Sequence, residues 1–359
     1  MTAESVAPRG RRRKNVRPQP GAAPAPERPA AAPARADHVP GLRAGWRVIA
    51  AKEFADHVLS VRFLILTIIL GLAAAAAVYA TAGAISDIAA DATGVPSLFL
   101  KLFTITSGQI PPFTTFIAFL GPLLGIAFGF DGINGERAEG TLPRLVSQPI
   151  HRDDVVNGKF VAGLSAITII FIAITALVAA IGILQLGILP SVEEVIRLLV
   201  WIALAVAYVG LWLALALLCS VVLRRAATSA LVAIAVWLLM TLFAALLVGV
   251  LASFLAPVPA DAGSGSAAAL RNASMQAELA RLSPSQLFQE ATAAVLDPSV
   301  RTLNPGLVTF DQADRAIPSI LSLEQSLLVV WPQFVALIAV TAVAFAVAYV
   351  AFMRQEVRA

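Results

Sequence analysis

Six long segments of this chain contain no aspartate, glutamate, lysine or arginine, and this spacing of charge constrains the fold more than any other feature. The segments are 63–86, 102–130, 160–192, 198–223, 226–260 and 325–353. Each exceeds the roughly 20 residues that a helix needs to cross about 30 Å of hydrocarbon. Short segments of alternating polarity, typical of a membrane β-barrel, are absent from the sequence. We therefore predict an all-α integral membrane protein with six transmembrane helices.

Composition supports this class, because 58% of the 359 residues are hydrophobic and only 13% are charged. A water-soluble domain of this size does not tolerate that balance. The single cysteine, Cys219, excludes an intramolecular disulfide framework. His38, His57 and His151 all lie outside the apolar segments, which excludes a haem-ligand pair or an HExxH zinc site within the membrane. We expect no metal and no cofactor.

The distribution of basic residues predicts the topology. Residues 1–41 are rich in proline, alanine and arginine, which predicts a disordered basic cytoplasmic tail. Twelve of the 26 lysines and arginines lie at or before Arg62, which places the N-terminus on the cytoplasmic side. A six-span domain over 62–353 then returns the tail 354–359 to the same side. We expect a multi-pass protein of the cytoplasmic (inner) membrane with both termini cytoplasmic.

Residues 42–61, before the first span, are predicted to form an amphipathic helix in the cytoplasmic interface. Apolar residues such as Ile49, Phe54 and Val58 recur at roughly helical spacing, and charged residues occupy much of the remaining surface. Trp46 is then expected at headgroup level. A plain extension of the first span is the alternative interpretation.

On the outer side we expect a tight turn at 190–197 and a long loop at 257–324. The loop carries two helix-start signals. Ser283 precedes a proline and stands three residues before Gln286, and Ser322 has the same spacing to Gln325 just before the sixth span. We predict two or three short helices in this loop, forming a small helical outer domain.

The sequence also excludes several activities. No ionisable residue lies deep in any apolar segment, which disfavours transport by a proton relay and leaves no acid or base for an intramembrane enzyme. A P-loop is absent, because Gly158-Lys159 is followed by Phe160 and no glycine stands five residues before Gly158. The chain is therefore predicted to be non-catalytic and to hydrolyse no ATP.

The cytoplasmic loop at 132–158, between the second and third spans, is the most informative segment. Thr141 can cap a short helix whose first turn tolerates Pro143, and Leu142 and Leu145 then form its apolar edge. Pro149 ends this helix, and Asp153 or Asp154 is expected to cap the next one. A short helix held at the membrane surface offers a partner protein a rigid contact. A charged loop that only satisfies topology explains the spacing equally well.

This loop resembles the corresponding segment of ABC-2 type transporter permeases. The shared pattern is an acidic residue, Ile, a Glu-Arg pair, Gly-Thr-Leu and a Ser-x-Pro-x-x-Arg ending. The matching positions are Asp131, Ile133, Glu136, Arg137, Gly140, Thr141, Leu142, Ser147, Pro149 and Arg152. The six-span layout extends the resemblance over about residues 42–359. Ala138 and Pro143 depart from it, because the family usually has acidic residues at these positions.

The resemblance implies a transmembrane permease subunit whose coupling helix, 140–147, seats in a groove of a separate cytoplasmic ATPase subunit. Two permeases and two ATPases would form the working unit in the lipid membrane, with no nucleic acid involved, and would export or flip a substrate. The implied ATPase-coupling residues are Glu136, Arg137, Gly140, Thr141, Leu142, Leu145, Ser147 and Arg152. Glu136 and Arg137 would act as a hinge at the root of this helix.

The long loop between spans five and six is similar to that of the subgroup containing the permease that assists copper-site maturation in nitrous oxide reductase. The copper-related role is not carried over, because loop architecture is a poor guide to cargo. The alternative function is a membrane-anchored structural or regulatory protein that recruits a partner through its outer loop.

Gly121, Gly125 and Gly129 recur every four residues in the second span and so share one helix face. Small residues at this spacing let two helix backbones approach closely in a membrane. We expect this face to pack against another span of the same chain. Packing between two permease subunits is the alternative.

Overall fold

The computed structural model describes the chain from residue 45 to residue 355, with gaps. The described residues are 45–91, 97–106, 110–141, 151–187, 189–259, 261, 263, 265–300 and 321–355. Helices account for the regular structure within these ranges, and no strand occurs there. The predicted all-α class is therefore confirmed. The predicted tail at 1–41 lies outside the described residues.

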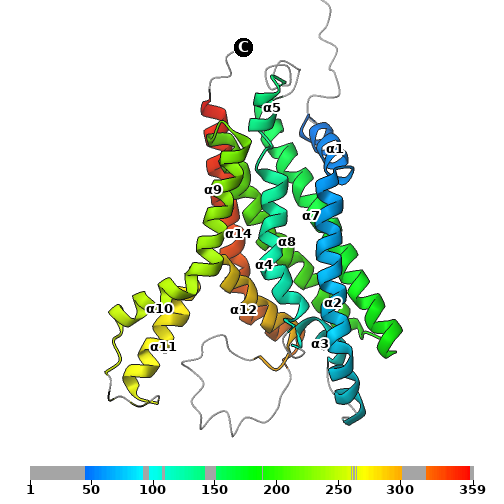
Figure 1. Cartoon of the computed structure of the whole chain (residues 1–359), viewed down its shortest axis with the longest axis vertical. Helices are drawn as coiled ribbons and strands as arrows, with labels where there is room; N and C mark the ends of the chain where they lie inside the picture. The colour runs from blue at the N-terminus through cyan, green and yellow to red at the C-terminus, as the bar shows by residue number, and fades with distance from the viewer. Residues whose placement is uncertain are drawn as a thin grey trace, which may run out of the picture. The chain divides into compact units, whose positions relative to one another are not determined.

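The helices are arranged in a bundle of long spans with shorter helices at its ends (Figure 1). Their bounds are α1 Gly45–Val58, α2 Val61–Asp91, α3 Leu98–Thr104, α4 Phe113–Gly129, α5 Asn134–Ala138, α7 Arg152–Leu186, α8 Val192–Val222, α9 Ala226–Leu238, η2 Leu239–Phe243, α10 Ala244–Leu255, α11 Ala267–Ala280, α12 Pro284–Leu296 and α14 Leu323–Arg354. Figure 1 shows α5 and the end of α14 at one end of the bundle, here called the α5 end, and α3 at the other, here called the α3 end.

Six helical segments within the described residues are long and apolar enough to cross a membrane, as the sequence predicted. They are Val61–Thr81, Phe113–Ala138, Arg152–Gln185, Val192–Val222, Ala226–Leu255 and Leu323–Arg354. The fifth combines α9, the π-helical turn η2 and α10. The chain is therefore a multi-pass membrane protein.

The second span begins later than the uncharged segment 102–130 suggested. That segment is divided between α3, which ends at Thr104, and α4, which starts at Phe113. Pro111 and Pro112 precede α4, and proline both lacks a backbone N–H and disfavours helical geometry in the residue before it. Absence of charge was therefore the wrong criterion for this boundary.

Helix starts show where local signals were sufficient. The predicted capping box before the sixth span is confirmed, because Ser322 and Gln325 exchange side-chain to backbone hydrogen bonds. Ser283 does precede α12, but its hydroxyl donates to the carbonyl O of Met240 in η2 (2.7 Å) and makes no capping bond. The helix was predicted correctly, whereas the role of its first serine was not.

α8 is the central helix of the bundle, and α4 packs closely against it. A Cβ atom added to Gly125 would lie 2.6 Å from the carbonyl O of Val209 in α8. One added to Gly129 would lie 2.8 Å from the carbonyl O of Leu213, and one added to Gly121 would lie 2.8 Å from a methyl group of Val209. The backbones of α4 and α8 therefore approach as only glycine permits, within one chain.

α12, from the predicted outer loop, packs among the long spans. Phe288 is fully buried and stacks on Tyr208 of α8, with ring centroids 4.5 Å apart and an interplanar angle of 9°. The indole N–H of Trp201 donates to the hydroxyl of Thr292 (3.1 Å). Glu290 of α12 accepts a hydrogen bond from the side chain of Gln333 in α14 (3.2 Å). An ionisable residue thus contacts a membrane span, which the apolar segments alone did not suggest.

The α3 end is fastened by acidic and basic residues in the first turns of α8. The expected turn at 190–197 is shorter than predicted, because α8 begins at Val192. Glu194 accepts hydrogen bonds from the backbone N–H groups of Ser191 (2.8 Å) and Phe99 (3.0 Å), so one carboxylate caps both α8 and α3.

Arg197 is fully buried at this end and donates five hydrogen bonds. Its partners, at 2.8 to 3.0 Å, are Glu193 Oε1, which accepts twice, Val295 O, Ser326 Oγ and Leu321 O. An arginine has five N–H donors, so every one is satisfied. The guanidinium joins α8, the end of α12 and the start of α14.

Candidate functional site

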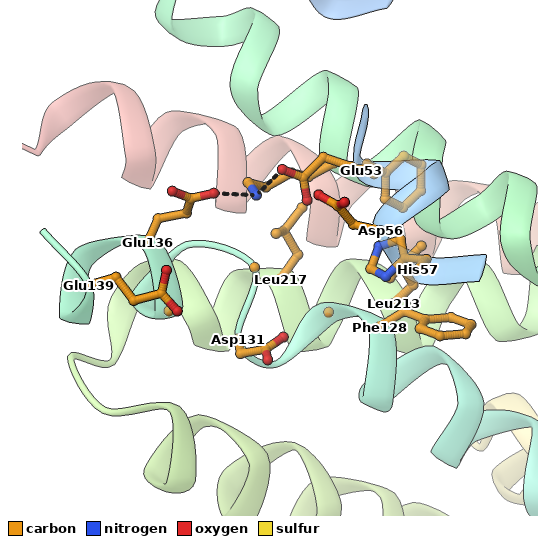
Figure 2. A pocket seen from close by; sticks show the side chains of 14 residues that line it. Glu53, Asp56, His57, Phe128, Asp131, Glu136, Glu139, Leu213 and Leu217 are labelled. Atoms are coloured by element: carbon orange, nitrogen blue, oxygen red, sulfur yellow. Dashed lines mark hydrogen bonds and ion pairs between the residues drawn. The ribbon is translucent and has the colours of Figure 1, made fainter. Parts of the chain in front are cut away.

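The site lies at the α5 end and is organised around a buried lysine. Lys159 of α7 has a side chain that is only 6% exposed. Its Nζ lies 2.7 Å from Glu53 Oε1 of α1 and 3.3 Å from Glu136 Oε1 of α5 (Figure 2). Because a buried ammonium group is stable only when it is paired, Lys159 ties α1 and α5 to α7.

α1 approaches α7 closely enough to make this pairing possible. A Cβ atom added to Gly158 would lie 2.7 Å from a side-chain carbon of Ile49 and 3.0 Å from the carbonyl O of Trp46. Gly158 therefore lets α1 lie against the start of α7. The Lys159 side chain next to it then reaches Glu53.

A pocket of about 300 Å³ adjoins the lysine. The charged and titratable residues lining it are Glu53, Asp56, His57, Asp131, Glu136, Glu139 and Lys159. Figure 2 shows that the acidic side chains come from α1 on one side and from α5 and the residues just before and after it on the other. Four of the five carboxylates already lie in ion pairs: Glu53 and Glu136 with Lys159, Asp131 with Arg62, and Asp56 with Lys52. In the described part of the chain no three His, Cys, Asp or Glu residues are placed to hold a metal ion.

His57 lies in this pocket against Phe128, with ring centroids 4.9 Å apart. Burial lowers the pKa of His57 below its usual range, and the opposing carboxylate of Glu53 offsets only part of that effect. The nearby charge of Lys159 lowers the pKa of His57 further. His57 is therefore held in its neutral form more strongly than an exposed histidine.

The segment 131–134, which leads into α5, is held to two neighbouring helices, α2 and α8. Asp131 pairs with Arg62 of α2, with Oδ2 and Nη1 2.5 Å apart. The backbone N–H groups of Ile133 and Asn134 donate to the hydroxyl of Ser220 in α8 (2.9 and 3.1 Å). These bonds satisfy two of the free N–H groups at the start of α5.

Four of the predicted coupling residues fall in or just after α5. Glu136 bonds Lys159 and also accepts a hydrogen bond from the hydroxyl of Thr141. Gly140 has a φ of +69°, a conformation that glycine adopts without strain. Arg137 donates to Gln355 Oε1 beyond the end of α14 (2.6 Å).

The remaining coupling residues have two different outcomes. Arg152 begins α7 and donates to the backbone carbonyl O of Gln355 (2.9 Å). The N-cap of α7 is His151, whose backbone N–H donates to Asp154 (3.2 Å), so of the two aspartates considered, Asp154 serves the helix start. Leu142, Leu145 and Ser147 lie outside the described residues, as does most of the predicted helix at 140–147.

Sequence reasoning missed three residues that hold this region together: Glu53, Lys159 and Gln355. Glu53 was counted with the charged face of the interfacial helix, and Lys159 with the basic residues that set topology. Lys159 gave no decisive signal, because a lysine directly before an apolar segment has the same pattern whether it is hydrated or buried with a partner. Gln355 carries no local signal.

Similarity to known proteins is found at the level of the family. No curated protein matches the chain. The family model described as ABC-2 family transporter protein matches residues 47–357, which include most of α1, the six spans and the loop after α5. Since the match extends over most of the sequence, the chain belongs to the ABC-2 transporter family.

Proposed function

We propose that this chain is the permease subunit of an ATP-binding cassette transporter of the cytoplasmic membrane, and that it exports or flips its substrate with ATP hydrolysed by a separate subunit. The α5 end then faces the cytoplasm, with both termini on that side. Two copies of the chain and two ATPase subunits form the working complex within the lipid bilayer.

The observation that carries the proposal is the Lys159 junction at the root of the coupling loop. Glu136 in α5 and Glu53 in α1 share the ammonium group of Lys159, which lies at the start of a membrane span. A partner that pushes on the loop after α5 therefore acts on a joint of three helices. Family membership supports a cytoplasmic ATPase as that partner.

In this proposal the helix at 140–147 contacts the ATPase and α5 is its hinge. Thr141 bonds Glu136, and Gly140 provides a positive φ, so the chain turns sharply where α5 ends and the coupling helix begins. Glu136 and Arg137 hold the hinge to Lys159 and Gln355, while Leu142, Leu145 and Ser147 face the ATPase. The three glycines of α4 hold α4 to α8 in the same subunit.

The test is co-purification of an ATPase with the affinity-tagged full chain from its native membranes. Replacing both Leu142→Asp and Leu145→Asp removes the apolar edge of the coupling helix and should abolish recovery of a P-loop ATPase. Leu189→Asp is the matched control, because Leu189 is exposed in the turn before α8 at the α3 end. Recovery of the ATPase at the wild-type level with the double variant would overturn the assignment of this helix.

A further inference from the structure

Gln355, the residue that follows α14, lies where three other elements begin or end. Its side-chain N–H donates to the carbonyl O of Val221 at the end of α8 (2.8 Å), and its side-chain carbonyl accepts from Arg137 Nη2. Its backbone carbonyl accepts from Arg152 Nη2. One residue therefore joins α5, α7 and α8 to the end of α14.

Arg137 and Arg152 bracket the loop that is proposed to contact the ATPase. Arg137 lies in α5 before the loop, and Arg152 is the first residue of α7 after it. The Arg152 guanidinium also lies over the ring of Phe352, 5.8 Å from its centroid. Since hydrogen bonds from a charged donor are stronger than neutral ones, a displacement of the loop must move Gln355 or break both bonds.

α14 carries this connection to the other end of the bundle. Its 32 residues correspond to a helix of about 48 Å. At the α3 end, Ser326 of α14 accepts a hydrogen bond from Arg197, and so does the carbonyl O of Leu321 just before the helix. Gln333 of α14 donates to Glu290 of α12. A shift of the end of α14 along its axis thus acts directly on α12.

We propose that Gln355 is a positioning residue for transport: it fastens both ends of the coupling loop to α14, so that movement of the loop reaches α12 at the α3 end. The inference rests on the proposed function, because the ATPase supplies the movement. It goes beyond that function by assigning the transmission to α14 and to a residue outside the coupling motif.

The experiment compares Gln355→Met with Gln355→Glu in the permease–ATPase complex purified by a tag on the full chain. Methionine keeps the length of the side chain but removes both of its hydrogen bonds. Glutamate retains the acceptor for Arg137. Each variant carries Cys219→Ala and Gln289→Cys, which places a single thiol at an exposed position of α12. The rate of its labelling by a membrane-impermeant maleimide is measured with and without ATP and orthovanadate.

When Gln355 is unchanged, the thiol at position 289 should be labelled at a rate that depends on nucleotide. When labelling is compared at equal amounts of bound ATPase, Gln355→Met should reduce the nucleotide-dependent change at least about fivefold, the lower end of a typical coupling between sites. Gln355→Glu should restore most of that change. Gln185→Met, an exposed glutamine at the far end of α7, is the control and should leave the change intact.

The possible results distinguish a failure of this inference from a failure of the proposed function. A full nucleotide-dependent change in Gln355→Met, with ATPase bound, would overturn the role of Gln355 and leave the permease assignment standing. Failure of any ATPase to co-purify with the unsubstituted chain would overturn the proposed function and, with it, this inference. Equal loss in Gln355→Met and Gln185→Met would show a general weakening of the protein and would also refute the specific role.

Discussion

The two ends of the bundle are each held by one buried cation, but by different means. At the α3 end, Arg197 is completely buried and uses all five N–H groups, three of them on backbone carbonyls or the hydroxyl at helix ends. At the α5 end, Lys159 bonds two carboxylates and adjoins a pocket of about 300 Å³ lined by further acidic residues.

This difference indicates which end is built to rearrange. A guanidinium is a rigid planar donor whose bonds fix several directions at once, whereas an ammonium is a compact charge on a flexible stem. Lys159 is shared between Glu53 and Glu136 beside a pocket, so it can lose one carboxylate and keep the other. The hydrogen bonds of Arg197 are therefore suited to move α12 and α14 together at the α3 end, and those of Lys159 to rearrange at the α5 end.

The largest effect is expected from Arg197→Met. The substitution leaves the carbonyl groups of Val295 and Leu321 without their donor in a buried site, which should cost about 1–3 kcal/mol of unfolding free energy for each group. Thermal unfolding in detergent measures the loss. Arg271→Met, on the exposed face of α11, should change stability little. Similar stability for the two variants would remove the basis of the comparison.

Lys159→Met is expected to cost less, about 1–3 kcal/mol, because the freed carboxylates of Glu53 and Glu136 face the pocket and can be hydrated. Its loss of co-purifying ATPase should nevertheless exceed that of other variants of equal stability, since the junction of α1, α5 and α7 is lost. Unfolding and ATPase co-purification are measured on the same preparation. A stability loss larger than that of Arg197→Met would reverse the ranking of the two ends.

Gly125→Ala tests the close contact between α4 and α8, the seam that runs between the two ends of the bundle. The added methyl group would lie 2.6 Å from the carbonyl O of Val209, so α4 and α8 must separate, at a cost of about 1–3 kcal/mol. Gly249→Ala in α10 meets no atom within 4 Å and should stabilise the protein by up to about 1 kcal/mol through helix propensity. Unfolding midpoints that move in the same direction for both variants would contradict tight packing of this seam.

The smallest expected effect is a pH dependence of the unfolding free energy that arises from His57 at the α5 end. Because burial depresses the pKa of His57 in the folded protein, the unfolded chain binds more protons in the range just below pH 6.5. Stability is then full above that pH and falls as the pH drops through the folded-state pKa. His57→Gln should flatten this part of the profile of unfolding midpoint against pH. An unchanged slope in the variant would show that another group titrates.

The sequence predicts those parts of the fold that local chemistry specifies. Absence of charge locates the spans, and the spacing of Ser322 to Gln325 locates the start of the last one. The predicted start of the second span was wrong, because Pro111 and Pro112 disfavour a helix before α4 although the residues around them are apolar. Arg197 was placed in a turn, since a basic residue before an apolar segment has the same pattern whether it is hydrated or fully satisfied inside.

The candidate site is predictable only in part, because its partners are distant in sequence. The motif identified Glu136 and Arg137, but not the residues they bond. Lys159 is 106 residues from Glu53, and Gln355 is 218 residues from Arg137. Such pairs arise from how the helices pack, which no window of the sequence contains. The same holds for Glu290, whose loop position gave no indication that α12 would contact the spans.

The double use of Glu194 has a consequence for how the chain tolerates insertions and deletions. One carboxylate reaches the N–H groups of Ser191 and Phe99, so the length of the connection before α8 and the angle of α3 are set by the same side chain. Adding or removing one residue between Ser191 and Glu194 would rotate the carboxylate by about 100° around the helix and release two helix starts together. Tags, epitopes and fusion partners are therefore best placed before this point, at Leu189.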